Sequence, residues 1–137
     1  MKLIFASKNS GKTRELSQAL EGTEFSLESL IGQKIEAAPE TGSSFLENAL
    51  IKCKSVAEIT GMPTVADDSG LVVPALNGRP GIYSARYSGS GATDEENIQK
   101  LTREMMPISD RRAYFICCIV FMVSPEDPFP IFAQGLW

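Results

Sequence analysis

Two adjacent acids, Asp67 and Asp68, are the residues whose types and spacing best suit chemistry. They follow the apolar run 62–66 and precede Ser69 and Gly70, so the sequence predicts that they lie at the carboxyl end of a buried strand. Adjacent carboxylates repel each other unless a cation or a hydrogen-bond donor compensates the charge. Because open α/β sheets bind ligands at such strand ends, we expect metal binding, acid/base chemistry or both. A tight Asp-rich turn is the alternative.

The chain contains no histidine, which limits the chemistry that these acids can take part in. Ser-His-Asp and Cys-His catalysis and His-rich zinc sites are excluded. Oxygen ligands favour magnesium, manganese or calcium over zinc. The three cysteines, Cys53, Cys117 and Cys118, lack CxxC spacing, which fits a reducing cytoplasm. Cys117 and Cys118 lie in the apolar run 115–120, so the sequence predicts that these two are core thiols.

A second candidate is the segment 7–13, SKNSGKT, between a predicted strand and a predicted helix. Backbone amides at a helix N-terminus bind phosphate, Gly11 lets the backbone approach closely, and two lysines add positive charge. The segment matches the end of the P-loop pattern GxxxxGK[ST], but Ala6 occupies the position of its opening glycine. An ordinary capped turn with solvated lysines fits the same residues.

Two further segments carry groups that suit an anionic or metal-bound ligand. Glu40 lies in a loop between a proline and a glycine, whereas Glu47 is expected to cap the helix that follows. Lys52 is a solvated lysine unless its end of that helix faces a site. Residues 78–89 hold two arginines, two tyrosines and several glycines. They fit the border of an anionic site and equally well an ordered surface loop.

The elements that must position these groups include both strands and helices. Strands are predicted at residues 2–6, 25–30, 63–66, 112–123 and 129–134, a short apolar stretch at 71–73, and helices at 12–20, 44–59 and 93–106. A chain of 137 residues with 43% hydrophobic content is long enough for one domain with a real core. We therefore expect a single α/β domain over residues 1–137, with a mixed central sheet flanked by helices.

The net charge and the hydropathy of the chain limit the kinds of partner that we expect it to bind. A net charge of −4 argues against a broad nucleic-acid-binding face, but a local basic pocket would still accept a small anion. No apolar run reaches transmembrane length and no signal peptide begins the chain, so neither a membrane nor a nucleic acid polymer is expected as a partner. Trp137 follows directly on a predicted strand, which predicts a chain cut short at its C-terminus.

Four segments in this order resemble the Ham1 family of inosine triphosphate pyrophosphatases, also called XTP/dITP or non-canonical purine nucleoside triphosphate pyrophosphatases. The segments are ASKNSGKTREL (6–16), ETGSSFLENA (40–49), ADDSGL (66–71) and PGIYSARYSG (80–89). The late hairpin ending in QGLW (134–137) agrees as well, whereas Lys8 stands where the family often has glycine. The resemblance implies an ITPase-like (Maf/Ham1-type) α/β fold that lacks its C-terminal portion.

The resemblance also implies an activity. It is the magnesium-dependent hydrolysis of ITP, dITP and XTP between the α and β phosphates, which yields a monophosphate and pyrophosphate and cleanses the nucleotide pool. A cytoplasmic homodimer is implied too. Two alternatives stay open, a P-loop-type NTPase and an inactive nucleotide-binding fragment, because the family continues beyond Trp137 with segments that hold the base and phosphates.

Site roles follow from the same resemblance. Asp68 would be the general base and a metal ligand, Glu40 would help to hold Mg²⁺, and Asp67 is a secondary metal candidate. The residues expected to contact the substrate are Ser7, Lys8, Asn9, Ser10, Gly11, Lys12, Lys52 and Ser69. These roles agree with the chemistry, because phosphoryl transfer asks chiefly for charge neutralisation and positioning and does not need histidine.

Overall fold

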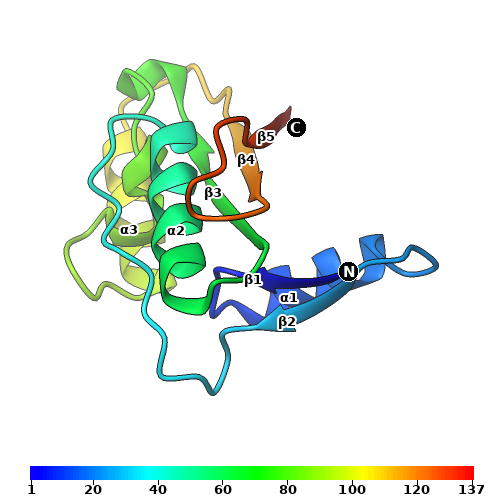
Figure 1. Ribbon diagram of the computed structural model, residues 1–137. Coiled ribbons are helices and arrows are strands. Elements are labelled where there is room, and N and C mark those ends of the chain that lie inside the picture. The colour runs from blue at the N-terminus through cyan, green and yellow to red at the C-terminus, as the bar shows by residue number, and fades with distance from the viewer. The chain divides into compact units, whose positions relative to one another are not determined.

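The computed structural model describes residues 1–137 and contains five strands, three α-helices and two short 3₁₀ helices (Figure 1). In chain order these are β1 (Lys2–Phe5), α1 (Ser10–Ala19), β2 (Ser26–Ser29), α2 (Phe45–Thr60), β3 (Thr64–Val72), η1 (Pro74–Leu76), η2 (Gly81–Arg86), α3 (Asp94–Met105), β4 (Tyr114–Met122) and β5 (Ile131–Leu136). Each strand and helix predicted from the sequence is present, and the ends differ by at most two residues except at the end of β3. None of the helices is both long and apolar enough to span a bilayer.

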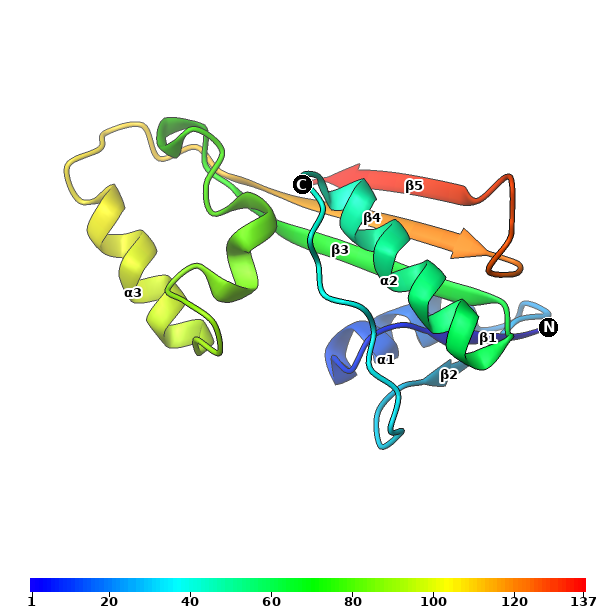
Figure 2. The ribbon, with the colours of Figure 1, turned by 60° about the vertical axis from the view of Figure 1, so that its left-hand side comes forward.

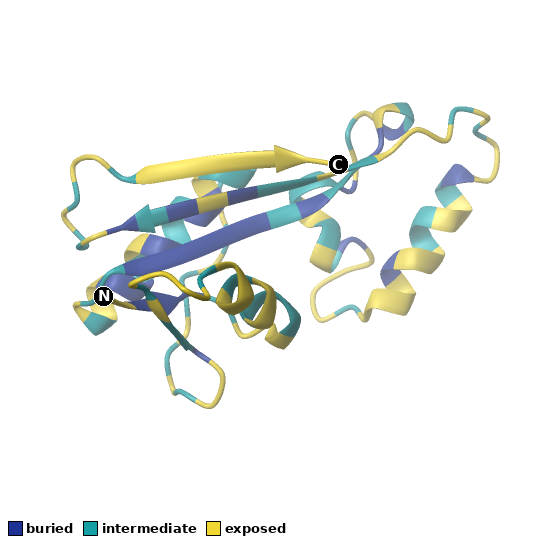
Figure 3. Cartoon of the chain, turned by 90° about the vertical axis from the view of Figure 1, so that its right-hand side faces the viewer, coloured by how far each residue is buried: buried dark blue, intermediate teal, exposed yellow.

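The strands form one sheet in the order β2-β1-β3-β4-β5. Strand β1 is parallel to both β2 and β3, with Ile4 opposite Thr64. Phe115 and Trp137 exchange backbone hydrogen bonds of 2.9 and 3.2 Å, which is the antiparallel pattern. The predicted mixed sheet is therefore confirmed. All six residues of β5, at the edge of the sheet, are exposed (Figure 3).

Strand β3 is longer than the sequence predicted. It continues to Val72, so the prediction that Asp67 and Asp68 follow the end of this strand is wrong. Its neighbour β1 ends at Phe5, opposite Val65, so the acids lie beyond the carboxyl end of β1 instead. Successive strand residues point to opposite faces, and the two carboxylates are therefore directed apart. This geometry relieves the repulsion that two adjacent acids would otherwise suffer.

Two apolar clusters place α1 and α2 on opposite faces of β1 (Figure 2). Ile4 packs with Ala49 and Cys53 of α2, all at least 97% buried. Phe5, the next residue, belongs to a cluster that includes Leu16 of α1. The period-2 alternation of β1 thus gives each helix its own apolar surface.

The chain divides into two compact units. The first comprises residues 1–67 and 118–133, and the second comprises residues 68–117 and 134–137, so β3, β4 and β5 contribute to both. The second unit has its own small core of Val73, Leu76 and Met105. A single-domain organisation over residues 1–137 stays a prediction.

The predicted caps of α2 and α3 are confirmed, whereas α1 begins two residues earlier than predicted, at Ser10. Ser44 accepts a hydrogen bond from the backbone N–H of Glu47 at 3.1 Å, and Gly61 ends α2 with φ of 65°. Thr93 and Glu96 cap α3 reciprocally, through bonds of 2.8 and 3.2 Å.

The Glu47 carboxylate holds the loop before α2 and makes the fold sensitive to acid. It accepts hydrogen bonds from the backbone N–H of Ser43 at 2.6 Å and from its hydroxyl at 2.8 Å, which lowers the pKa of Glu47 below its ordinary 4.5. A carboxylate with a lowered pKa stabilises the fold above its ordinary pKa, and this contribution is lost as the pH falls through the lowered value.

We therefore expect Glu47→Gln to lose less unfolding free energy than the wild type when the pH falls from about 5 to about 3. Urea unfolding at each pH measures the difference. Glu58→Gln, on the exposed side of the same helix, is the matched control and should keep the wild-type dependence. An identical loss in Glu47→Gln and wild type would contradict the prediction.

Candidate functional site

A short loop between β1 and α1 presents the N-terminus of α1 beyond the end of β1. Asn9 is the N-cap, and its side-chain oxygen accepts a hydrogen bond from the backbone N–H of Lys12 at 3.1 Å. Ser7 accepts one from the backbone N–H of Asn9 at 3.2 Å. These two side chains shape the loop, and no acidic residue lies in the first turn. The backbone N–H groups of that turn therefore suit an anion such as phosphate.

Lys12 reaches from α1 to β3. Its Nζ lies 2.6 Å from Oδ2 of Asp67, and the two side chains are 36% and 5% exposed. The other oxygen of Asp67, Oδ1, is buried and has no hydrogen-bond partner, the only such buried side-chain atom in the structure. A buried acceptor without a donor costs about 1–3 kcal/mol, so the fold alone does not explain this oxygen.

The oxygen donors fit a hard divalent cation. An unpaired carboxylate oxygen such as Asp67 Oδ1 is the donor type that Mg²⁺ prefers. No three or more His, Cys, Asp or Glu side chains gather into a group able to hold a metal, so the predicted ligands Glu40, Asp67 and Asp68 do not form a cage by themselves. Proteins usually hold Mg²⁺ with one or two carboxylates, the remaining ligands being water and substrate phosphates.

Lys52 is not a solvated lysine. Its Nζ lies 2.8 Å from Oε1 of Glu40, and the side chains of this ion pair are 14% and 23% exposed. The middle of α2, which carries Lys52, therefore faces the loop that carries Glu40. The structure thus brings these two predicted site residues together, as it does Lys12 and Asp67.

Asp68 and Ser69 follow along β3. Asp68 is 6% exposed, and its Oδ1 accepts a hydrogen bond from the backbone N–H of Ser69 at 3.0 Å. Because it is two residues beyond Ala66, Asp68 shares the strand face of that residue. Burying a second carboxylate in one strand is costly, which favours a functional reason for it.

Lys8, a predicted substrate contact, forms an ion pair with Glu36 on the exposed surface. A triphosphate would compete with Glu36 for this lysine. Lys8 therefore has the weakest structural support among the residues predicted to bind substrate.

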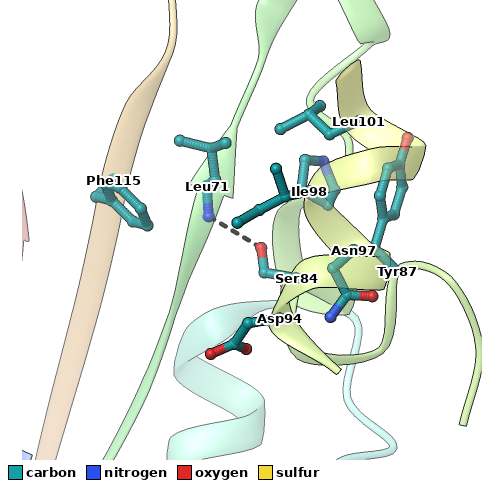
Figure 4. Close-up of a pocket in the computed structure, with 9 residues that line it drawn as sticks. Leu71, Ser84, Tyr87, Asp94, Asn97, Ile98, Leu101 and Phe115 are labelled. Atoms are coloured by element: carbon teal, nitrogen blue, oxygen red, sulfur yellow. Dashed lines mark hydrogen bonds between the residues drawn. The ribbon is translucent and has the colours of Figure 1, made fainter. Parts of the chain in front are cut away.

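The loop at residues 78–89 borders an open pocket of about 290 Å³ (Figure 4). Two polar side chains that line the pocket hold the loop in place. Ser84 accepts a hydrogen bond from the backbone N–H of Leu71 at 2.9 Å, and Asn97 accepts one from the backbone N–H of Ser88 at 2.8 Å. Arg79 donates to the carbonyl of Leu76 at 3.1 Å. These contacts favour the ordered-loop interpretation over the border of an anionic site.

Sequence reasoning missed two side chains that hold the Glu40 loop. Asn48 accepts a hydrogen bond from the backbone N–H of Gly42 at 2.8 Å, and Ser55 accepts one from that of Ala38 at 2.9 Å. The available signal was their i, i+4, i+7 spacing with Lys52, which places all three on one face of a helix.

Comparisons with known protein sequences show which family the chain resembles. The sequence model of the Ham1 family matches residues 3–137. A dITP/XTP pyrophosphatase of Shigella flexneri is 44% identical over an alignment of 138 positions that covers 99% of this chain and 70% of that protein. One from Idiomarina loihiensis is 47% identical over an alignment of 141 positions that covers 98% of this chain and 70% of the relative.

Solved structures that superpose on this chain point to the same family. A HAM1 protein from Coxiella burnetii superposes with a TM-score of 0.90 at 40% identity, over 100% of this chain and 71% of that chain. A nucleoside-triphosphatase, dITP/XTP pyrophosphatase, from Mycobacterium abscessus gives a TM-score of 0.82 at 41% identity, over 100% and 72%. The ITPase-like α/β fold implied by the four sequence segments is thereby confirmed. The chain belongs to the Ham1 family.

Proposed function

We propose that this protein hydrolyses non-canonical purine nucleoside triphosphates such as ITP, dITP and XTP to the monophosphate and pyrophosphate. The observation that carries the proposal is the match to dITP/XTP pyrophosphatases at 44–47% identity over 98–99% of the chain. The chemistry of the candidate residues supports it, because they include a helix N-terminus and two partly buried ion pairs of a lysine with a carboxylate, Lys12 with Asp67 and Lys52 with Glu40.

Binding of the triphosphate would use the loop before α1. The backbone N–H groups at the start of α1 donate to phosphate oxygens, with contributions from Ser7, Asn9, Ser10 and Gly11. Lys12 and Lys52 neutralise part of the negative charge of the triphosphate. Ser69 contributes a hydroxyl.

Asp68 would act as the general base. It takes a proton from the attacking water, an oxygen–phosphorus bond forms, and the bond that bridges the α and β phosphates breaks to release pyrophosphate. Glu40 and Asp68 would hold Mg²⁺, with Asp67, whose Oδ1 is unpaired, as a further ligand. The bound ion supplies charge neutralisation at the phosphate oxygens and orients the substrate.

A cytoplasmic location and a homodimer complete the proposal. The three cysteines lack CxxC spacing, which fits a reducing compartment. The expectation of a dimer rests on the family resemblance and is tested by light scattering, in which a monomer at micromolar concentration would contradict it.

Product analysis tests the activity. The chain is incubated with ITP and MgCl₂, and the phosphorus products are identified by ³¹P NMR. Pyrophosphate with IMP is the expected result. Orthophosphate with IDP would favour a P-loop-type NTPase, and magnesium-dependent binding of ITP without turnover would favour an inactive nucleotide-binding fragment.

A further inference from the structure

One face of α2 makes three successive contacts with the loop that precedes it. Asn48, Lys52 and Ser55 follow one another at helical spacing on this face. The contacts are Asn48 Oδ1 with the N–H of Gly42 at 2.8 Å, Lys52 Nζ with Oε1 of Glu40 at 2.8 Å, and Ser55 Oγ with the N–H of Ala38 at 2.9 Å. The loop therefore runs antiparallel to α2 and alongside it (Figures 1 and 2).

We propose that Asn48 and Ser55 are positioning residues that hold the Glu40 carboxylate in place by anchoring the backbone on both sides of it. The two anchored amides, at residues 38 and 42, lie two residues before and two residues after Glu40. The consequence of this anchoring for turnover rests on the proposed function.

The hydrogen bonds to the backbone amides restrict the position of Glu40, whereas its ion pair with Lys52 does not. Lys52 has a long, flexible side chain, so its ammonium group can follow a moving carboxylate and gives little positional control. A hydrogen bond to a backbone amide instead fixes the chain itself. With two such anchors four residues apart, the loop has little freedom to shift the residue between them. Displacing a catalytic group by about 1 Å can cost about a hundredfold in rate.

Close packing at Gly42 limits movement toward the helix. A Cβ added to Gly42 would lie 2.6 Å from Cβ of Glu47 and 2.8 Å from Oδ1 of Asn48. Because Asn48 is fully buried, it has no room to give way. Glycine is therefore required here by the close approach of the loop to α2, not by its backbone angles.

Ser55→Ala is the decisive variant, because Ser55 is only half-buried and its loss leaves the core intact. Hydrogen–deuterium exchange is followed at the amide of Ala38, and kcat and KM are measured with ITP and magnesium. We expect exchange at Ala38 to accelerate about tenfold or more, since this amide loses its acceptor. We expect kcat to fall about tenfold, with a smaller change in KM and a melting temperature near that of the wild type.

Two matched variants complete the test. Ser55→Thr keeps the hydroxyl and should restore both the slow exchange and kcat. Thr60→Val removes a hydroxyl that donates to the Val56 carbonyl and accepts from the N–H of Met62, both away from the Glu40 loop, so kcat and exchange at Ala38 should stay at the wild-type values. Asn48→Ala should accelerate exchange at Gly42, with an added loss of stability because it empties a fully buried site.

The proposal is overturned if exchange at Ala38 is unchanged in Ser55→Ala, or if kcat stays at the wild-type value although exchange accelerates. An equal loss of kcat in Thr60→Val would also overturn it. Failure of the wild type to hydrolyse ITP contradicts the proposed function instead, and the exchange measurement still decides whether Ser55 anchors the loop.

Discussion

Asp68→Asn is expected to lower kcat for ITP hydrolysis by about 10²–10⁴-fold, the range that a general base contributes. Asparagine has the shape of aspartate but does not accept a proton near neutral pH. The asparagine side-chain oxygen can still accept the hydrogen bond that Asp68 Oδ1 accepts from the backbone N–H of Ser69, so we expect the variant to stay folded while the activity is lost. Steady-state kinetics and a thermal melt of the same sample measure both.

Asp110→Asn is the matched control for this experiment. Asp110 forms an ion pair with Arg112 at 2.7 Å on the surface, where the arginine is 81% exposed. Its neutralisation should leave kcat near the wild-type value. Should Asp68→Asn retain kcat within about threefold of the wild type, Asp68 is not the general base.

Lys12→Met is expected to lower the free energy of unfolding by about 2–4 kcal/mol, because it leaves the charge of Asp67 buried without its ion pair. The value lies at or below the usual cost of breaking a buried pair, since Lys12 is itself 36% exposed. Asp67→Asn should cost much less, because the lysine that remains is accessible to water. The two variants of one ion pair thus have unequal effects on stability, while both lower turnover.

Urea unfolding of the two single variants and the double variant tests this asymmetry. The double variant Lys12→Met/Asp67→Asn should recover most of the stability lost in Lys12→Met, with a coupling energy of at least about 1.5 kcal/mol. Lys2→Met provides a surface control, because Lys2 pairs with Glu28 at 2.5 Å with the side chains 61% and 36% exposed. Equal costs for Lys12→Met and Lys2→Met would show that burial of Asp67 carries no penalty.

Much of the fold follows from local sequence signals. The capping residues Ser44 and Thr93 and the closing Gly61 predicted the ends of α2 and α3, because caps satisfy backbone groups within a few residues of themselves. The strands β1 and β4 were evident as apolar runs. Four sequence segments in order were enough to indicate the family and, with it, the candidate residues Lys12, Glu40 and Asp68.

The boundary of β3 shows why local signals have limits. Two acids followed by Ser69 and Gly70 are typical of a turn, yet β3 continues through them to Val72. Whether a polar stretch stays extended depends on the neighbouring strands available to pair with it, and those neighbours are distant in the sequence. Because side chains alternate between the two faces of a strand, β3 also directs the adjacent carboxylates of Asp67 and Asp68 apart.

The sequence by itself determined the chemical types of the site residues, the absence of histidine and the family to which the chain belongs. Only the tertiary structure decided which of these residues meet: Lys12 with Asp67, and Lys52 with Glu40. It alone also identified the unpaired Oδ1 of Asp67 and the anchors Asn48 and Ser55. The physical reason is that ion pairing and desolvation depend on distance and burial in space, and spacing along the chain constrains these only within a single helix or strand.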